Sequence, residues 1–249
     1  VLAGFLIASY VTFGLPVLVP VASGQKIVYI AIISGGLGLV AQIFLRSGCF
    51  LVLTSFFGII LSFSWIGWKK IFAPVSMEHL GALLILAGCG LAAYKVLSIR
   101  HRNADNTNKN DDLVILAVVS IAIALNAFMG ASASIAQNSG ALAVSLGAMI
   151  ICNWVGLNVP PGPVTRFVPL IILPALLAQI HYFTKANMWP LALLLLAFFT
   201  GNLAHRFVPP YIQKSKFMRP IVIGAINTIP AIASVVMSWA FLPVAASGY

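Results

Sequence analysis

Amide side chains inside apolar segments are the residues of this sequence best placed to do chemistry. Four of the last five apolar runs carry an internal asparagine, whereas the first four carry none: Asn126, Asn153, Asn202 and Asn227. An amide in an apolar medium must find hydrogen-bond partners, so these side chains should face a bundle interior or a wet cavity. Two interpretations follow, and both stay open. Either these residues, with Gln137, line a pathway for a small solute, or they hold helices together by hydrogen bonds.

Charged side chains beside the apolar runs supply the remaining candidates. Arg166 precedes the seventh run and Arg206 follows the eighth, so both are candidate contacts for an anionic solute near the cytoplasmic face. Glu78 and His79 form the one acid–imidazole neighbour pair at a predicted membrane surface. They are candidates for gating or proton relay, although Glu78 also fits the first turn of a helix.

The carboxylates lie outside the middle of every apolar run. Asp111 and Asp112 precede the fifth run, where a carboxylate caps free N–H groups and meets the positive end of the helix dipole. Proton- and sodium-coupled carriers commonly hold an ionisable group at mid-membrane. Coupling would therefore use other groups or another subunit.

Catalytic and cofactor motifs are missing from the sequence. It contains neither GxxxxGK[ST] nor GxGxxG, and its histidines and carboxylates form no metal-binding cluster. The three cysteines lie in apolar runs and are interpreted as packing residues. We expect no enzymatic activity, no cofactor and no metal.

Composition predicts the class of fold. Of the 249 residues 61% are hydrophobic and 7% charged, against about 45–50% and about 25% in soluble domains. Runs such as Leu191 to Phe199 are continuously apolar, whereas strands of membrane barrels alternate apolar and polar residues. We predict an all-α integral membrane protein, a polytopic bundle of about nine transmembrane helices (range eight to ten) without a soluble domain.

Nine apolar runs define the predicted spans and their grouping. They are Leu2 to Ala22, Ile27 to Leu45, Cys49 to Trp68, His79 to Leu97, Leu113 to Ile135, Leu142 to Leu157, Phe167 to Tyr182, Trp189 to Ala204 and Ile221 to Phe241. Residues 1–98 form a four-span segment, 99–112 a polar cytoplasmic loop, and 113–249 a five-span segment. Pro169 and Pro174 interrupt the seventh run, and Pro230 predicts a kinked helix or two half-helices in the ninth.

Basic residues predict the orientation. The even-numbered loops carry ten of them and the odd-numbered loops four: Arg46, Lys95, Arg100, Arg102, Lys109, Arg166, Arg206, Lys214, Lys216 and Arg219, against Lys26, Lys69, Lys70 and Lys185. Short loops rich in Lys and Arg stay on the cytoplasmic side. We expect a cytoplasmic N-terminus in a plasma or inner membrane, with anionic lipid headgroups as partners of the +10 formal charge. Nucleic acid is not an expected partner, because no basic domain lies outside the membrane.

Small residues predict close helix contacts in the first half of the chain, and the second half shows a resemblance to known membrane domains. Gly35, Gly36 and Gly38 form a small-residue face on the second run. Spans five to eight resemble the membrane domains of fusaric-acid-resistance-type and aromatic-acid exporters. The likeness consists of paired spans joined by short turns and a basic residue, Arg166, opening a span. It includes no diagnostic residue.

These features favour a permease that moves a small solute through a polar cavity lined by the C-terminal spans. The near absence of acidic residues permits an organic anion as that solute. The alternative is a non-catalytic transmembrane subunit of a larger secretion, redox or ATP-driven complex. A homo-oligomer or other membrane subunits are the expected protein partners. A lipid-processing membrane enzyme is least favoured, because no nucleophile–base pair is present.

Overall fold

The computed structural model describes residues 1–16, 18, 20, 22–44, 48–72, 88, 90, 109–157, 159, 162–184, 188–213, 215 and 217–241. For some helical residues within these ranges, including 200–207, only the backbone is described. The predicted fourth span lies outside the described residues except for Gly88 and Gly90, and so do Glu78 and His79.

Every regular element in the described ranges is a helix. The helices are α1 (Leu2–Phe13), α2 (Ser23–Phe44), α3 (Gly48–Phe72), α5 (Lys109–Met129), α6 (Ala133–Trp154), α7 (Pro163–Phe183), α8 (Met188–Phe207), α9 (Pro210–Gln213) and α10 (Met218–Ala240). Five of them, α2, α5, α6, α7 and α10, are long and apolar enough to cross a membrane. Shorter apolar stretches occur in α1, α3 and α8. The prediction of an all-α fold is confirmed for the described residues, and the five apolar helices are compatible with a membrane protein, whereas the count of about nine spans is not confirmed.

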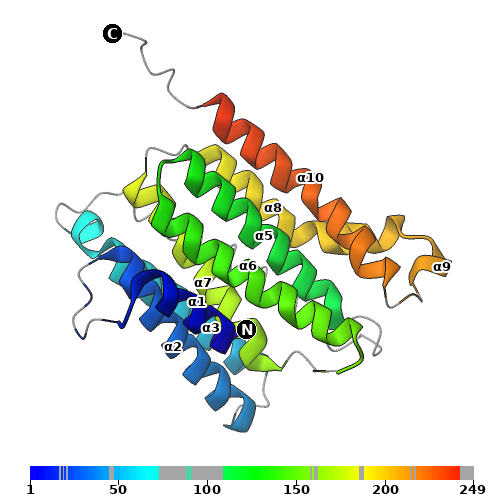
Figure 1. Cartoon of the computed structure of the whole chain (residues 1–249), viewed down its shortest axis with the longest axis horizontal. Coiled ribbons are helices and arrows are strands. Elements are labelled where there is room, and N and C mark those ends of the chain that lie inside the picture. Colours follow the sequence, from blue (N-terminus) through cyan, green and yellow to red (C-terminus); the bar gives the residue numbers. More distant parts are fainter. Residues whose placement is uncertain are drawn as a thin grey trace.

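Helix α7 occupies the centre of the bundle. It packs against α2, α3, α5 and α6, while α10 packs against α5 and α8 on the outer side (Figure 1). Helix α1 packs against α2 and α6. The two predicted segments therefore share one bundle, and α5 begins at Lys109, inside the predicted loop 99–112.

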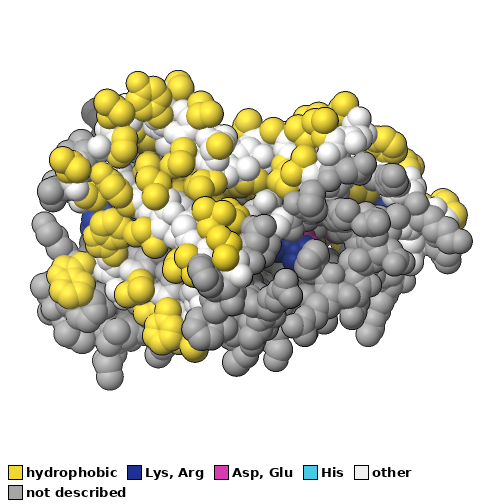
Figure 2. All heavy atoms as spheres, turned by 90° about the horizontal axis from the view of Figure 1, so that it is seen from below, with side chains coloured by type: hydrophobic (Ala, Val, Ile, Leu, Met, Phe, Trp, Pro, Cys, Tyr) yellow, Lys and Arg dark blue, Asp and Glu magenta, His cyan; other side chains and the backbone are white. Residues whose placement is uncertain are grey.

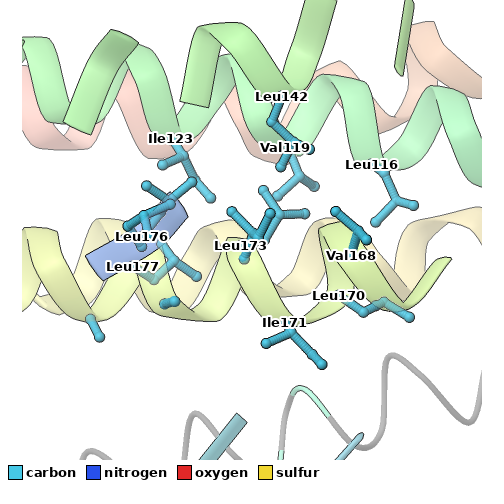
Figure 3. Close-up of a cluster of buried hydrophobic side chains, with 14 of the residues drawn as sticks. Leu116, Val119, Ile123, Leu142, Val168, Leu170, Ile171, Leu173, Leu176 and Leu177 are labelled. Atoms are coloured by element: carbon cyan, nitrogen blue, oxygen red, sulfur yellow. The ribbon is translucent and has the colours of Figure 1, made fainter. Parts of the chain in front are cut away.

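The core forms where α7 meets its neighbours. Leu173 and Leu176 of α7 lie opposite Val119 and Ile123 of α5 and Leu142 of α6 (Figure 3). A helix that is apolar on all sides is stable only when buried, and most of α7 is buried.

The helices run through their internal prolines. Helix α7 continues unbroken past Pro169 and Pro174, and α10 continues past Pro230. The expected interruption of the seventh span is therefore wrong, and of the two forms expected for the ninth span, two separate half-helices are not found. A proline removes one intrahelical hydrogen bond, and neighbouring helices in a membrane bundle tolerate that loss.

The outer surface is apolar and carries tryptophans near one end. Apolar side chains cover much of the described part of the face in Figure 2. Trp68 near the end of α3, Trp189 at the start of α8 and Trp239 near the end of α10 are all exposed. Exposed tryptophan at helix ends is typical of a membrane–water interface.

The turn between α5 and α6 corrects two predicted boundaries. Helix α5 ends at Met129 and α6 begins at Ala133, with Ala131 at a φ of 58° between them. The expected end of the fifth span at Ile135 and the start of the sixth at Leu142 are therefore wrong. The polar stretch that suggested a loop, Gln137 to Ser139, lies in the second turn of α6. The chain reverses after the left-handed Ala131, where the amide of Ser132 donates to the carbonyl of Ala127 at 2.9 Å and that of Ala131 to the carbonyl of Phe128 at 3.1 Å.

Candidate functional site

The bundle has two polar ends. We call the end at which α5, α7 and α10 begin the Asp111 end, and the end at which α2 begins and α7 finishes the Asn138 end. Two ion pairs place the three helix starts together. A hydrogen bond from Gln179, near the end of α7, to Ser23, at the start of α2, marks the other end.

Two ion pairs tie the helix starts at the Asp111 end. Arg219 Nε of α10 donates to Asp111 Oδ2 of α5 at 3.0 Å, and Arg166 Nη2 of α7 lies 3.5 Å from Asp112 Oδ2. All four residues are buried. Arg219 also donates from Nη1 to the carbonyl of Gln213 at 3.1 Å. Both carboxylates lie in the first turn of α5, so the helix dipole stabilises their charge as expected.

Asn153 lies beside this group of charges. Its Nδ2 donates to Oδ1 of Asn110 at 2.8 Å, and Asn110 directly precedes Asp111. The structure therefore brings Asn153 and Arg166, two of the predicted site residues, to the same end. Sequence reasoning missed Arg219 as their neighbour. The sequence did hold a signal for it. Arg166 and Arg219 precede two predicted spans on the same side of the membrane on which Asp111 and Asp112 precede a third.

Asn126 is part of a complete hydrogen-bond network near the Asn138 end. Its Nδ2 donates to the carbonyl of Ala122 at 2.8 Å and to Ser234 Oγ at 3.1 Å. Ser234 Oγ donates to the carbonyl of Pro190 at 2.7 Å, and Ser238 Oγ donates to Asn126 Oδ1. The network joins α5, α8 and α10. Of the two roles considered for the internal asparagines, Asn126 therefore fits that of holding helices together by hydrogen bonds.

A second amide group gathers at the start of α2. Gln179 Nε2 of α7 donates to the carbonyl of Ser23 at 2.5 Å. On the next residue, Gly24, an ideal Cβ would lie 3.9 Å from Asn138 Nδ2 of α6. Amides from α6 and α7 thus converge on the first turn of α2. Asn138 lies about 8 Å and Gln179 about 6 Å from the nearer ends of their helices, at 1.5 Å per residue.

Apart from Gln179 Nε2, the polar side-chain atoms of this group lack partners within the described part of the chain. Asn138 is 1% exposed, yet neither Nδ2 nor Oδ1 has a hydrogen bond there. The same holds for Gln179 Oε1 and for the hydroxyls of Ser139 and Ser9. We call Asn138, Ser139, Gln179 and Ser9 the amide cluster.

The register of α1 on α6 sets the level of Ser9 along the bundle. Gly4 of α1 lies against Ser145 of α6, and Phe13 of α1 lies beside Gly24 together with Ser134 of α6. The paired residue numbers sum to 149 (4 and 145) and 147 (13 and 134), so the helices are antiparallel and residue 9 is level with residues 138–140.

Of the remaining predicted residues with described side chains, Asn227 and Gln137 join neither group. Asn227 is buried near the middle of α10, and Gln137 is exposed on α6. The side chains of Asn202 and Arg206 are outside the described residues. Asn126 and Asn153 lie at opposite ends, about 24 Å apart along the helix axis. The predicted asparagines therefore do not meet in one place.

The amide cluster can bind a molecule that supplies hydrogen-bond donors and acceptors. Among the described residues no group of three or more His, Cys, Asp or Glu side chains could hold a metal ion.

No protein-family model matches this sequence, and no curated protein or solved structure shows significant similarity to it. The resemblance to exporter membrane domains thus gains no support from these comparisons.

Proposed function

We propose that this chain is a multi-pass membrane permease that binds a small polar solute at the amide cluster. One observation carries the proposal. Asn138, fully buried within a helix long and apolar enough to cross a membrane, has two polar atoms without a partner among the described residues. A bound solute that forms these hydrogen bonds would satisfy both polar atoms of Asn138.

The two buried asparagines near this end differ in a way that separates structure from binding. Asn126 uses its donor and its acceptor in contacts with α10 and with its own helix. Asn138 uses neither within the described residues. Leaving a buried amide unsatisfied costs about 1–3 kcal/mol, so Asn138 destabilises the bundle unless water or a solute pairs with it. Helix association alone is therefore a poor account of Asn138.

The proposed site differs from the sequence-based one in place and in charge preference. It lies between α1, α2, α6 and α7 rather than within the last five spans. Arg166, the candidate anion contact, lies 3.5 Å from Asp112. An anion would have to open that ion pair, so we do not propose an anionic solute.

Transport by matched variants tests the proposal. Solutes would first be found by thermal-shift screening of the purified protein, and their uptake then measured in proteoliposomes. We expect Asn138→Leu to abolish uptake while leaving the melting temperature unchanged or higher, because it removes an unsatisfied amide. Gln137→Leu, one residue away and exposed, is the control and should transport normally. Wild-type uptake by Asn138→Leu would exclude this site.

The environment of the chain is part of the proposal. We place it in a plasma or inner membrane with the Asp111 end in the cytoplasm. Support comes from the basic residues of the described helices: Lys109, Arg166, Arg206 and Arg219 lie at the Asp111 end, against Lys26, Lys69 and Lys70 at the other end. Basic residues concentrate on the cytoplasmic side of membrane proteins.

The alternative role as a subunit of a larger complex has its own support. Helix α10 exposes large apolar side chains along its length, including Ile221, Ile232 and Trp239, and such a face contacts either lipid or another membrane helix. Purification in mild detergent followed by mass spectrometry separates the two roles. A stoichiometric set of partner proteins would favour the subunit role, and a chain that elutes alone would favour the permease.

A further inference from the structure

We propose, on the basis of the permease function above, that the solute is a small uncharged amphiphile. Its head carries hydrogen-bond donors and acceptors, and its apolar body has about the size of one aromatic ring. The body occupies a pocket between α1 and α2, and the head reaches the amide cluster.

The pocket that would hold the apolar body has a volume of about 200 Å³. Leu6, Phe13 and Val28 contribute apolar wall, and Ser9 and Gln25 are among its few polar residues. An apolar cavity of about 150 Å³ holds one benzene ring. The volume therefore suits a single substituted ring or a short branched chain.

Pocket and amide cluster adjoin each other through shared residues. Ser9 belongs to both, because it lines the pocket and its hydroxyl is one of the buried polar atoms without a partner in the described ranges. Phe13 and Gln25 line the pocket on either side of Gly24, whose ideal Cβ position is 3.9 Å from Phe13 Cε1 and from Asn138 Nδ2. Asn138 Nδ2 therefore lies at most about 8 Å from Phe13 Cε1 in the pocket wall, with Gly24 between them.

The atoms of the cluster favour an uncharged head. Asn138 Oδ1 and Gln179 Oε1 are acceptors, Asn138 Nδ2 is a donor, and the hydroxyl of Ser9 can act as either. A carboxylate cannot donate to the two carbonyl oxygens, and an ammonium cannot accept from the amide N–H. A carboxamide or hydroxyl head does both. Burying a charge here would also require a counter-charge, and the cluster contains none.

Benzamide is a probe that combines the two features, and three relatives each change one of them. Binding of radiolabelled benzamide to the protein in lipid nanodiscs would be measured directly, with the others as competitors. We expect saturable binding of benzamide. Acetamide, which lacks the ring, should bind at least about 100-fold more weakly, given the apolar area lost. Benzoate and benzylammonium, which carry charge, should bind at least about tenfold more weakly.

Substitutions in and near the pocket test whether benzamide binds there. Ser9→Ala should weaken benzamide binding about fivefold by removing one hydrogen bond, and Asn138→Leu should weaken it more. Val28→Phe fills the pocket and should abolish binding. Ile33→Phe is the matched control, because Ile33 is on the same helix, is exposed and does not line the pocket. Its affinity should equal that of the unchanged protein.

Several outcomes overturn the inference. They are absence of benzamide binding, equal binding of benzoate or acetamide, or unchanged affinity in Val28→Phe. Failure of the permease function gives a different result. Benzamide would then bind with the expected pattern, while proteoliposomes would show no flux of any solute. Conversely, if Asn138-dependent uptake of another polar solute is found and benzamide neither binds nor competes, the permease function stands and the amphiphile does not.

Discussion

Removing Arg219 should destabilise the bundle more than removing any other single charge in the described helices. Its guanidinium donates to Asp111 at 3.0 Å, and Asp111 is 0% exposed while Arg219 is 7% exposed. In Arg219→Met the carboxylate of Asp111 would keep its charge in a buried place without that donor. Breaking a buried pair by removing one partner costs about 3–5 kcal/mol, so we expect a loss of that size.

Removing both partners should cost much less than the sum of the two single losses. Replacing a buried ion pair by apolar residues of similar volume is often neutral or stabilising. We expect Asp111→Leu combined with Arg219→Met to recover most of the stability lost in Arg219→Met alone. The coupling between the two positions should therefore be about 2 kcal/mol or more, within the range known for residues in contact.

Reversible unfolding in mixed micelles by sodium dodecyl sulfate measures these free energies for the two single variants and the double variant. Arg166→Met provides a comparison, because the pair that it breaks has a longer separation of 3.5 Å, and its loss should be smaller. A loss below about 1 kcal/mol for Arg219→Met, or additive losses in the double variant, would refute the argument that this pair is a buried, coupled contact.

Two further predictions concern packing and orientation. Gly38→Ala should cost about 1–3 kcal/mol, because a Cβ would lie 2.8 Å from Val164 Cα. In contrast, Gly36→Ala, which meets nothing within 4 Å among the described residues, should stabilise the helix by up to about 1 kcal/mol; equal effects in a detergent melt would contradict this packing. In a cysteine-free background, Ser132→Cys should react with membrane-impermeant maleimide from outside intact cells and Leu157→Cys only after lysis. The reverse labelling would invert the proposed orientation.

Much of the fold could be predicted because the bilayer imposes it. Low charge and long apolar runs leave helices as the way to satisfy backbone groups in lipid, and the described starts and ends of α2, α3 and α7 lie within four residues of the predicted spans. The close contact of Gly38 with α7 was also predictable from residue size. The span boundaries near residue 135 could not be predicted, because a drop in apolarity predicts the end of a helix, whereas the polar residues there are helical. The turn of α6 that holds Gln137 to Ser139 is helical although its polar sequence resembles a loop.

That boundary error explains why the amide cluster was missed. Placing Asn138 in a loop removed it from the internal asparagines, although it lies deeper inside the protein than Asn153. Its neighbours, Ser9 and Gln179, belong to helices far away in the sequence. Partner choice among helices depends on packing in three dimensions, so the sequence pattern could suggest that amides are buried without showing which ones have partners.

Helix α7 connects the two polar ends. It carries Arg166 in its first turn and Gln179 near its last, about 20 Å apart at 1.5 Å per residue. Helix α7 is continuous through Pro169 and Pro174, and most of it is buried. The amide cluster and the Arg166–Asp112 ion pair therefore lie near opposite ends of one helix, and any displacement of α7 along its axis would have to change both.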